Sequence, residues 1–243
     1  MSKNYTLIKD ENETRKFIEK VLQPLKDDEV YIVVLTARKK YYPTISSSLE
    51  VVSRDIIRNN DTNKIIRKLK KLSIVEGIYT DKDNNIISIE AFALYILPEP
   101  RSMLKAYTDF TENINKWNYE NLKANDENKN LELYRKLDIK LFSSIHKSKS
   151  RSNYFIIDVD KKDEMLLLNI LSNFKDLSDI RWVSETRGGF HVIANRNEVT
   201  GKIIHEIIKR RTEFIEFRKE CMTPTPGTLQ GGFVVKEYIG TKN

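Results

Sequence analysis

The stretch Tyr154-Phe-Ile-Ile-Asp158-Val-Asp160 is a hydrophobic run that ends in two carboxylates. In a β-strand the side chains of residues i and i+2 point to the same face, so we expect Asp158 and Asp160 to project side by side. Like charges held that close repel one another and favour a shared hard cation such as Mg²⁺ or Mn²⁺, which prefers oxygen ligands. The pair is therefore a candidate metal site. The alternative is a strand that ends in acids because it is leaving the core.

The elements that follow this strand alternate in an order that predicts one folding unit. They read β-α-β-β-α-β, the order of the ferredoxin-like or RNA-recognition-type fold. In that fold the first and third strands are central neighbours and the fourth lies beside the first. In chain order we expect a strand over 154–160, a helix over about 162–174, strands over about 180–185 and 189–194 joined by a turn at Thr186-Arg-Gly-Gly189, a helix over about 199–211 and a strand over about 213–220.

Alternation along these strands assigns their residues to two faces. Phe155, Ile157 and Val159 would pack under the helices, which leaves the other face of the sheet open. Carboxylates meeting on that face suit a two-metal site for nucleotidyl transfer, and a His and an Arg beside them would neutralise phosphate charge. The competing interpretations are a core histidine and an edge strand with exposed acids; the choice between the two glutamates stays open. The ionisable residues expected on the open face are Asp158, Asp160, His191, Glu216, Arg218 and Glu220.

The first half of the chain predicts an α/β subdomain. We expect helices over 11–26 and about 47–71, strands over 31–36 and 86–97, and a largely helical segment over 101–147 with a polar break at about 124–130. Residues 1–125 would form the N-terminal subdomain with its connecting helix, and residues 126–243 the catalytic subdomain, together one module.

A basic and aromatic segment follows the first buried strand of that subdomain. Cations interleaved with tyrosines can bind phosphates and stack on bases, although a solvated loop has the same composition. The candidate nucleic-acid contacts are Arg38, Lys39, Lys40 and Tyr41.

Composition narrows the class of protein. Of 243 residues 40% are hydrophobic, which is enough for a core, and 42 Lys and Arg against 35 Asp and Glu give a net charge of +7, which suits a polyanionic partner. One cysteine and three histidines exclude a zinc cluster built from Cys and His. The chain lacks an apolar run of about 18 residues, so we expect a cytoplasmic protein with no membrane association.

Three sequence motifs together resemble those of the archaeo-eukaryotic primase superfamily, which includes the primase-polymerases of plasmids, phages and CRISPR loci. The motifs are Asp158-Val-Asp160, then Ser184-Glu-Thr-Arg-Gly-Gly-Phe-His191, then a further acid. The loop Pro226-Gly-Thr-Leu-Gln-Gly-Gly232 is similar to the Pro-Gly-Ser/Thr loop of some members. The resemblance covers about residues 150–240 well and the first half loosely, and it implies an RNA-recognition-type catalytic unit joined to an N-terminal α/β subdomain.

The resemblance also implies roles for individual residues. Asp158 and Asp160 would be ligands of Mg²⁺ or Mn²⁺, His191 would contact a nucleotide phosphate and Arg187 would support it. The family's third motif is most often an Asp, and here only Glu216 or Glu220 could fill it. The Arg or Lys often found near the Pro-Gly loop is replaced by Thr223-Pro-Thr225, with Lys219 and Lys236 as stand-ins.

The function expected on these grounds is a primase or primase-polymerase. It would join nucleoside triphosphates on a single-stranded DNA template in DNA replication, and it would act with a helicase or another replication protein, in a mobile element. The alternatives are a non-catalytic protein that binds nucleic acid or nucleotides on the same scaffold, in replication initiation or defence, and a metal-dependent nuclease that uses the same carboxylates.

Overall fold

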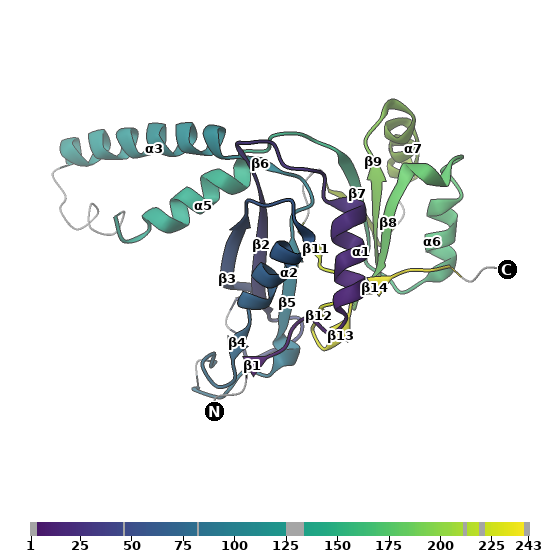
Figure 1. The fold of residues 1–243 in the computed structure, drawn as a ribbon, viewed down its shortest axis with the longest axis horizontal. Coiled ribbons are helices and arrows are strands. Elements are labelled where there is room, and N and C mark those ends of the chain that lie inside the picture. The colour runs from purple at the N-terminus through teal and green to yellow at the C-terminus, as the bar shows by residue number, and fades with distance from the viewer. Residues whose placement is uncertain are drawn as a thin grey trace.

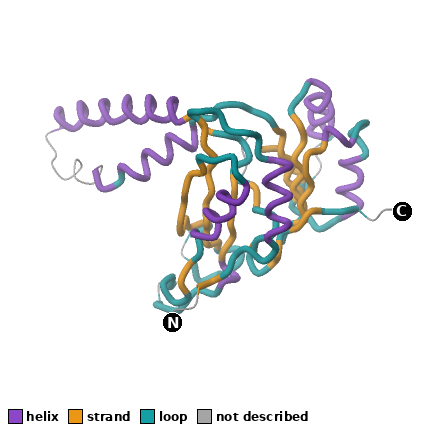
Figure 2. Tube along the Cα trace, viewed as in Figure 1, coloured by secondary structure: helices purple, strands orange, loops and turns teal. Residues whose placement is uncertain are grey.

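The computed structural model has the predicted α+β class, with helices packed on antiparallel sheets (Figures 1 and 2). The residues that it describes are 4–45, 47–81, 83–124, 134–210, 213–218 and 222–240.

A seven-stranded antiparallel sheet forms the N-terminal half. Its path runs β13 (Phe233–Val234), β12 (Leu229–Gln230), β5 (Phe92–Ile96), β2 (Glu29–Arg38), β3 (Leu49–Ile57), with β11 (Thr223–Pro224) also on β5 and β6 (Arg101–Ser102) on β2. A separate pair joins β1 (Asn4–Tyr5) to β4 (Ile74–Val75), and the 3₁₀ helix η1 (Ile89–Ala91) precedes β5.

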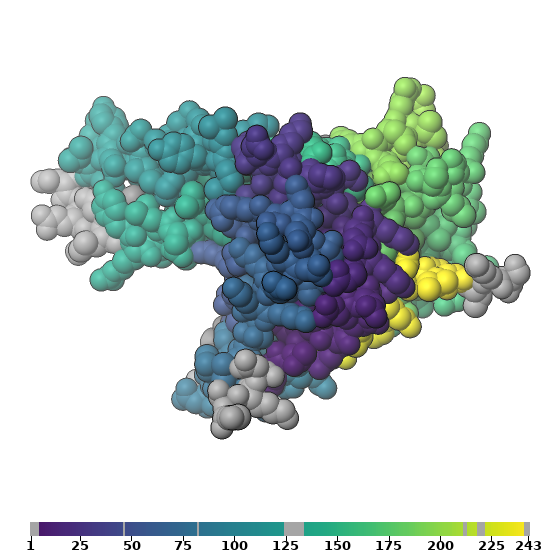
Figure 3. Space-filling view, in the orientation of Figure 1, coloured from purple at the N-terminus to yellow at the C-terminus, as the bar shows by residue number. Residues whose placement is uncertain are grey.

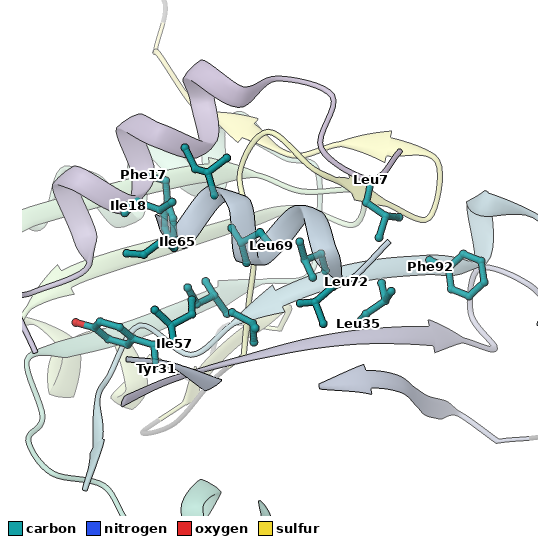
Figure 4. Close-up of a cluster of buried hydrophobic side chains, with 14 of the residues drawn as sticks. Leu7, Phe17, Ile18, Tyr31, Leu35, Ile57, Ile65, Leu69, Leu72 and Phe92 are labelled. Carbon is teal, nitrogen blue, oxygen red and sulfur yellow. The ribbon is translucent and has the colours of Figure 1, made fainter. Parts of the chain in front are cut away.

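Strand β2 is buried on both faces, which explains its continuous apolar run. One face, with Tyr31 and Leu35, packs under α1 (Glu11–Val21) and α2 (Thr62–Lys71) (Figure 4). The other face, with Ile32, packs against α3 (Met103–Ala124) and α5 (Leu137–Lys147). Each of the two covering helices α1 and α2 begins at an aspartate N-cap.

The prediction of one helical region over 47–71 is wrong for its first part. Residues Leu49–Ile57 form β3, which pairs antiparallel with β2 along its length, and only α2 is helical. The segment is rich in Val and Ile, whose branched side chains suit a strand, and the neighbouring edge of β2 offers it a ladder of backbone hydrogen bonds. Pairing with the preceding strand β2 therefore overrides the local apolar spacing.

Helices α3 and α5 run side by side as a hairpin that projects from the body of the molecule (Figures 1 and 3). The polar break expected at about 124–130 lies almost entirely outside the described residues. In the part of the chain that the structure describes, none of the helices has the length and apolar character needed to span a membrane.

A second, five-stranded antiparallel sheet forms the C-terminal half. Its first and third strands in chain order, β7 and β9, are neighbours in the centre, as the sequence predicted, and the last strand of the β-α-β-β-α-β series lies beside β7. The order is β10 (Ile215–Arg218), β7 (Tyr154–Val159), β9 (Phe190–Asn195), β8 (Ile180–Glu185), β14 (Lys236–Glu237), with α6 (Glu164–Leu171), the 3₁₀ helix η2 (Leu177–Asp179) and α7 (Glu198–Lys209) in the connections.

The two faces of this sheet are both covered over part of their area. Ile157 and Val159 pack with α6 and α7, as the alternation predicted. The opposite face, expected to be open, is covered at one end by α1, where Phe17 meets Trp182 edge-to-face with ring centroids 5.4 Å apart. Tyr154 and Trp182 are large apolar side chains on that face, and leaving them in water would be unfavourable. The prediction of an open face is therefore wrong at this end.

The C-terminal segment joins the two sheets. β11, β12 and β13 belong to the N-terminal sheet, whereas β14, a few residues later, belongs to the C-terminal one. Glu237 of β14 pairs with Lys20 of α1 at 2.9 Å, and Figure 3 shows the segment in yellow beside that helix. The Pro-Gly loop is hydrogen-bonded to the residues just before α1, because the Gly227 carbonyl accepts from the amides of Lys9 and Asp10 at 2.8 and 2.9 Å.

Candidate functional site

A row of polar side chains crosses the C-terminal sheet. Glu216, Asp158, His191 and Ser184 are register partners on the adjacent strands β10, β7, β9 and β8. Directly opposed residues of an antiparallel pair share a face, so this row lies on the face away from α6 and α7. The pairing of distant strands thus places Glu216 beside Asp158. Glu220, the other candidate for the third acid, lies outside the described residues.

Asp158 and His191 form the centre of the row. The Nε2 atom of His191 lies 2.8 Å from Oδ1 of Asp158, and His191 is 6% and Asp158 9% exposed. A carboxylate only accepts hydrogen bonds, so Nε2 carries the proton. The other ring nitrogen of His191, Nδ1, is buried and has no hydrogen-bond partner among the described residues. Buried polar atoms without a partner are rare in folded proteins, and a catalytic role is one of the reasons for which they are kept.

Asp158, Asp160 and His191 line a cavity of about 300 Å³ that lies between the two sheets. The N-terminal sheet supplies the facing wall with Arg38 and Tyr95, from β2 and β5. The structure therefore brings the carboxylate pair and part of the basic segment together, although they are more than a hundred residues apart in the chain. The remaining lining residues are Lys40, Leu49, Leu97, His146, Thr186, Gly188, Met222, Pro224 and Gln230.

The facing wall carries a cluster of cations and aromatic rings. Nη1 of Arg38 donates to the Tyr95 hydroxyl at 2.9 Å, and Lys40 Nζ lies 5.3 Å from the centroid of the Tyr41 ring. Burial raises the pKa of the Tyr41 hydroxyl, and the neighbouring Tyr95 raises it further, so this hydroxyl stays neutral. Arg38 and Lys40 supply positive charge to the cavity, whereas Lys39 is exposed and does not line it.

Arg187 contacts protein groups on the N-terminal sheet side. Its Nη1 atom donates to the Gly231 carbonyl at 2.6 Å, its guanidinium lies 4.8 Å from the Tyr41 ring centroid, and its backbone amide donates to the Gln230 side chain at 2.8 Å. The two hydrogen bonds connect the β8–β9 turn to the Pro-Gly loop. Arg187 does not line the cavity, and its predicted phosphate contact stays a prediction.

We expect Arg187→Ala to lower the free energy of unfolding by about 2 kcal/mol, because a charge-assisted hydrogen bond and a cation–π contact are both lost. Thermal unfolding measures the change, with Arg67→Ala on the exposed face of α2 as the matched control. An unchanged midpoint together with weaker nucleotide binding would instead support a phosphate contact.

Of the two other predicted nucleotide contacts, the structure places Lys236 away from the cavity. Lys236 is exposed on β14 and pairs with Glu185 at 3.0 Å. Arg218 ends β10, opposite Ile156 in the register, and its side chain lies outside what the structure describes. Lining residues that the sequence analysis missed include Tyr95 and His146. They come from separate segments, and only His146, as one of three histidines, carries a signal in the sequence. Gln230 also lines the cavity, and it belongs to the Pro-Gly loop that the sequence motifs had indicated.

The donor set of the cavity fits Mg²⁺ or Mn²⁺. These ions are commonly held by one or two carboxylates and take their other oxygen ligands from water and substrate phosphates, and Asp158 and Asp160 both line the cavity. Among the residues that the structure describes, no group of three His, Cys, Asp or Glu could hold an ion by itself. Oxygens of a substrate would therefore complete the coordination.

No family model, no curated protein and no solved structure matches this chain. Its function is therefore argued from the cavity and its lining residues.

Proposed function

We propose that the protein is a metal-dependent nucleotidyltransferase of the primase or primase-polymerase type, which makes oligonucleotides on a single-stranded DNA template in replication. The observation that carries the proposal is the meeting of Asp158 and Asp160 with Arg38 and Lys40 in one cavity. Carboxylates repel a polyanion unless a cation accompanies it, whereas Arg and Lys attract it. A nucleoside triphosphate with a bound divalent ion satisfies both sets of charges.

The strand order supports assigning the catalytic unit to the C-terminal sheet. The series from β7 to β10, with the order β10-β7-β9-β8 and two helices on one face, follows the ferredoxin-like pattern. The motifs that resemble the primase superfamily fall on β7 and at the β8–β9 turn, where they meet the cavity. We propose that this unit is the catalytic one and that the seven-stranded sheet supplies the substrate-facing wall.

The lining residues suggest separate roles for the carboxylates, the cations and the apolar side chains. Asp158 and Asp160 would hold the divalent ion, which when bound stabilises negative charge on the reacting phosphate. Arg38 and Lys40 would bind phosphates of the substrate or the template strand, and the apolar side chains of Leu97 and Met222 offer a surface for a sugar or base. In the reaction a 3′ hydroxyl attacks the α-phosphorus of a nucleoside triphosphate, the new P–O bond forms, and pyrophosphate leaves.

Glu216 is our choice for the third acid. It stands directly across from Asp158 in the β10–β7 register and is exposed, so its side chain lies on the same face of the sheet as an ion held by Asp158 would.

The proposal is tested with the purified chain, single-stranded DNA, Mg²⁺ or Mn²⁺ and labelled ribo- and deoxynucleoside triphosphates. New oligonucleotides are the expected result, and the labelled precursor that enters them identifies the preferred sugar. If the chain binds DNA or nucleotide and makes no product, the proposal is wrong and a binding protein is favoured. Shortened DNA in a reaction without nucleotides would favour the nuclease instead.

A further inference from the structure

Phe214 is held in a backbone conformation that a bulky residue rarely adopts. Its φ angle is +71°, in the left-handed region, where the side chain crowds the backbone. The residue nevertheless stays 43% exposed, so a large part of it is in contact with water. Glycine or asparagine would suit this position better for stability. A strained, exposed aromatic residue is therefore an observation that packing does not explain.

The strained turn is attached to the candidate site. The carbonyl of Phe214 accepts a hydrogen bond from the backbone amide of Asp160 at 2.9 Å. Asp160 lines the cavity, so the turn holds the backbone of one of the two carboxylates. The turn that carries Phe214 is therefore joined through its backbone to a residue of the cavity wall.

Two lysines that directly follow Asp160 each lie over an aromatic ring. Lys161 Nζ is 5.5 Å from the centroid of Phe214, and Lys162 Nζ is 3.9 Å from the centroid of Phe233 on β13. We name these four residues, Lys161, Lys162, Phe214 and Phe233, the rim. Cations interleaved with aromatic rings are the arrangement that binds phosphates and stacks bases of single-stranded nucleic acid.

The lysines of the rim are available to phosphate. Lys161 pairs with Asp163 at 3.0 Å and Lys162 with Glu185 at 2.9 Å, and the two lysine side chains are 51% and 42% exposed. Burial raises the pKa of Glu185, but hydrogen bonds from Lys162 and Lys236 outweigh it and lower that pKa, so the carboxylate is ionised. Exposed ion pairs of this kind are weak, and a phosphate can replace the carboxylate as the partner of each lysine.

We infer that the rim is a binding site for single-stranded nucleic acid, with phosphates on Lys161 and Lys162 and a base stacked on Phe214. The choice of this partner rests on the proposed function, because a templating or growing strand must pass beside the carboxylates. The binding itself needs neither metal nor nucleotide, so it can be measured apart from catalysis.

The test is the affinity for a fluorescently labelled oligothymidylate, measured by anisotropy over a series of NaCl concentrations. We expect Phe214→Gly to weaken binding about tenfold through the lost stacking, without a change in the salt dependence. Its thermal unfolding midpoint should stay the same or rise, since glycine relieves the strained φ. Weaker binding together with an unchanged or raised midpoint would show that the Phe214 ring acts in binding and is not needed for folding.

The double variant Lys161→Gln/Lys162→Gln is expected to act through charge. Each phosphate contact on single-stranded nucleic acid contributes about 0.7 to the slope of log K against log salt concentration, so losing two should reduce the slope by about 1.4. The matched control is Lys202→Gln/Lys209→Gln, which removes two exposed lysines of α7 that also pair with glutamates. The control should retain wild-type affinity.

Binding by both rim variants with wild-type affinity and slope would overturn the inference, and the surface would then serve another purpose such as contact with a protein. Failure here is distinct from failure of the proposed function. A wild-type chain that makes oligonucleotides while the rim variants bind normally refutes only the rim. A wild-type chain that makes no product, with rim variants that lose binding, refutes only the nucleotidyltransferase.

Discussion

Replacing Asp158 and Asp160 together by asparagine is expected to lower nucleotidyl transfer by about 10³-fold or more. Charge stabilisation by a bound divalent ion is worth several kcal/mol in the transition state, and each ~1.4 kcal/mol is a factor of ten in rate. Asparagine keeps the shape of the side chain but has no negative charge to hold the ion. The rate of oligonucleotide synthesis at saturating metal and nucleotide measures the loss.

The same variant should bind single-stranded DNA at least as tightly as the wild type, because two charges that repel phosphate are gone. The matched control is Glu198→Gln/Glu206→Gln, which removes two exposed acids from α7 and so makes the same change in net charge. It should synthesise at the wild-type rate. Retained synthesis in the Asp158→Asn/Asp160→Asn variant would contradict the assignment of these carboxylates to the metal.

The second large effect is expected at the turn between β8 and β9. A Cβ added to Gly189 would stand 1.8 Å from the Val159 carbonyl oxygen and 2.7 Å from the Lys161 amide nitrogen. Both neighbours are backbone atoms at the end of β7, so they cannot turn away as a side chain could. We expect Gly189→Ala to lower the free energy of unfolding by about 3 kcal/mol or more, a size typical of severe overpacking.

Gly188 provides an internal control, because a Cβ added there meets nothing within 4 Å. Gly188→Ala should change the free energy of unfolding by less than about 1 kcal/mol. Urea unfolding of the two variants beside the wild type measures the difference. Equal stability of the two variants would show that the β8–β9 turn does not hold the end of β7 as closely as the structure places it.

Much of the secondary structure could be predicted because apolar residues recur along it at a fixed spacing. The alternation in Phe155, Ile157 and Val159 repeats every two residues, and the apolar residues of α1 repeat with the helical period, so each element and its buried face follow from nearby residues. The region Leu49–Ile57 could not be predicted in this way. Its apolar spacing is compatible with a helix, and the strand forms because β2 offers a partner for its backbone.

The candidate site likewise has features that local patterns predict and features that only the tertiary structure decides. The sequence alone indicated a carboxylate pair on a strand, His191 on a neighbouring strand and a separate basic segment, since each is a local pattern of residue types. Only the tertiary structure decided that Arg38 and Asp158 share one cavity and that α1 covers part of the face expected to be open. These outcomes depend on which distant strands pair and which apolar faces meet. The spacing of apolar residues within a segment indicates the type of element and its buried face. Which elements become neighbours is determined by the burial of whole surfaces.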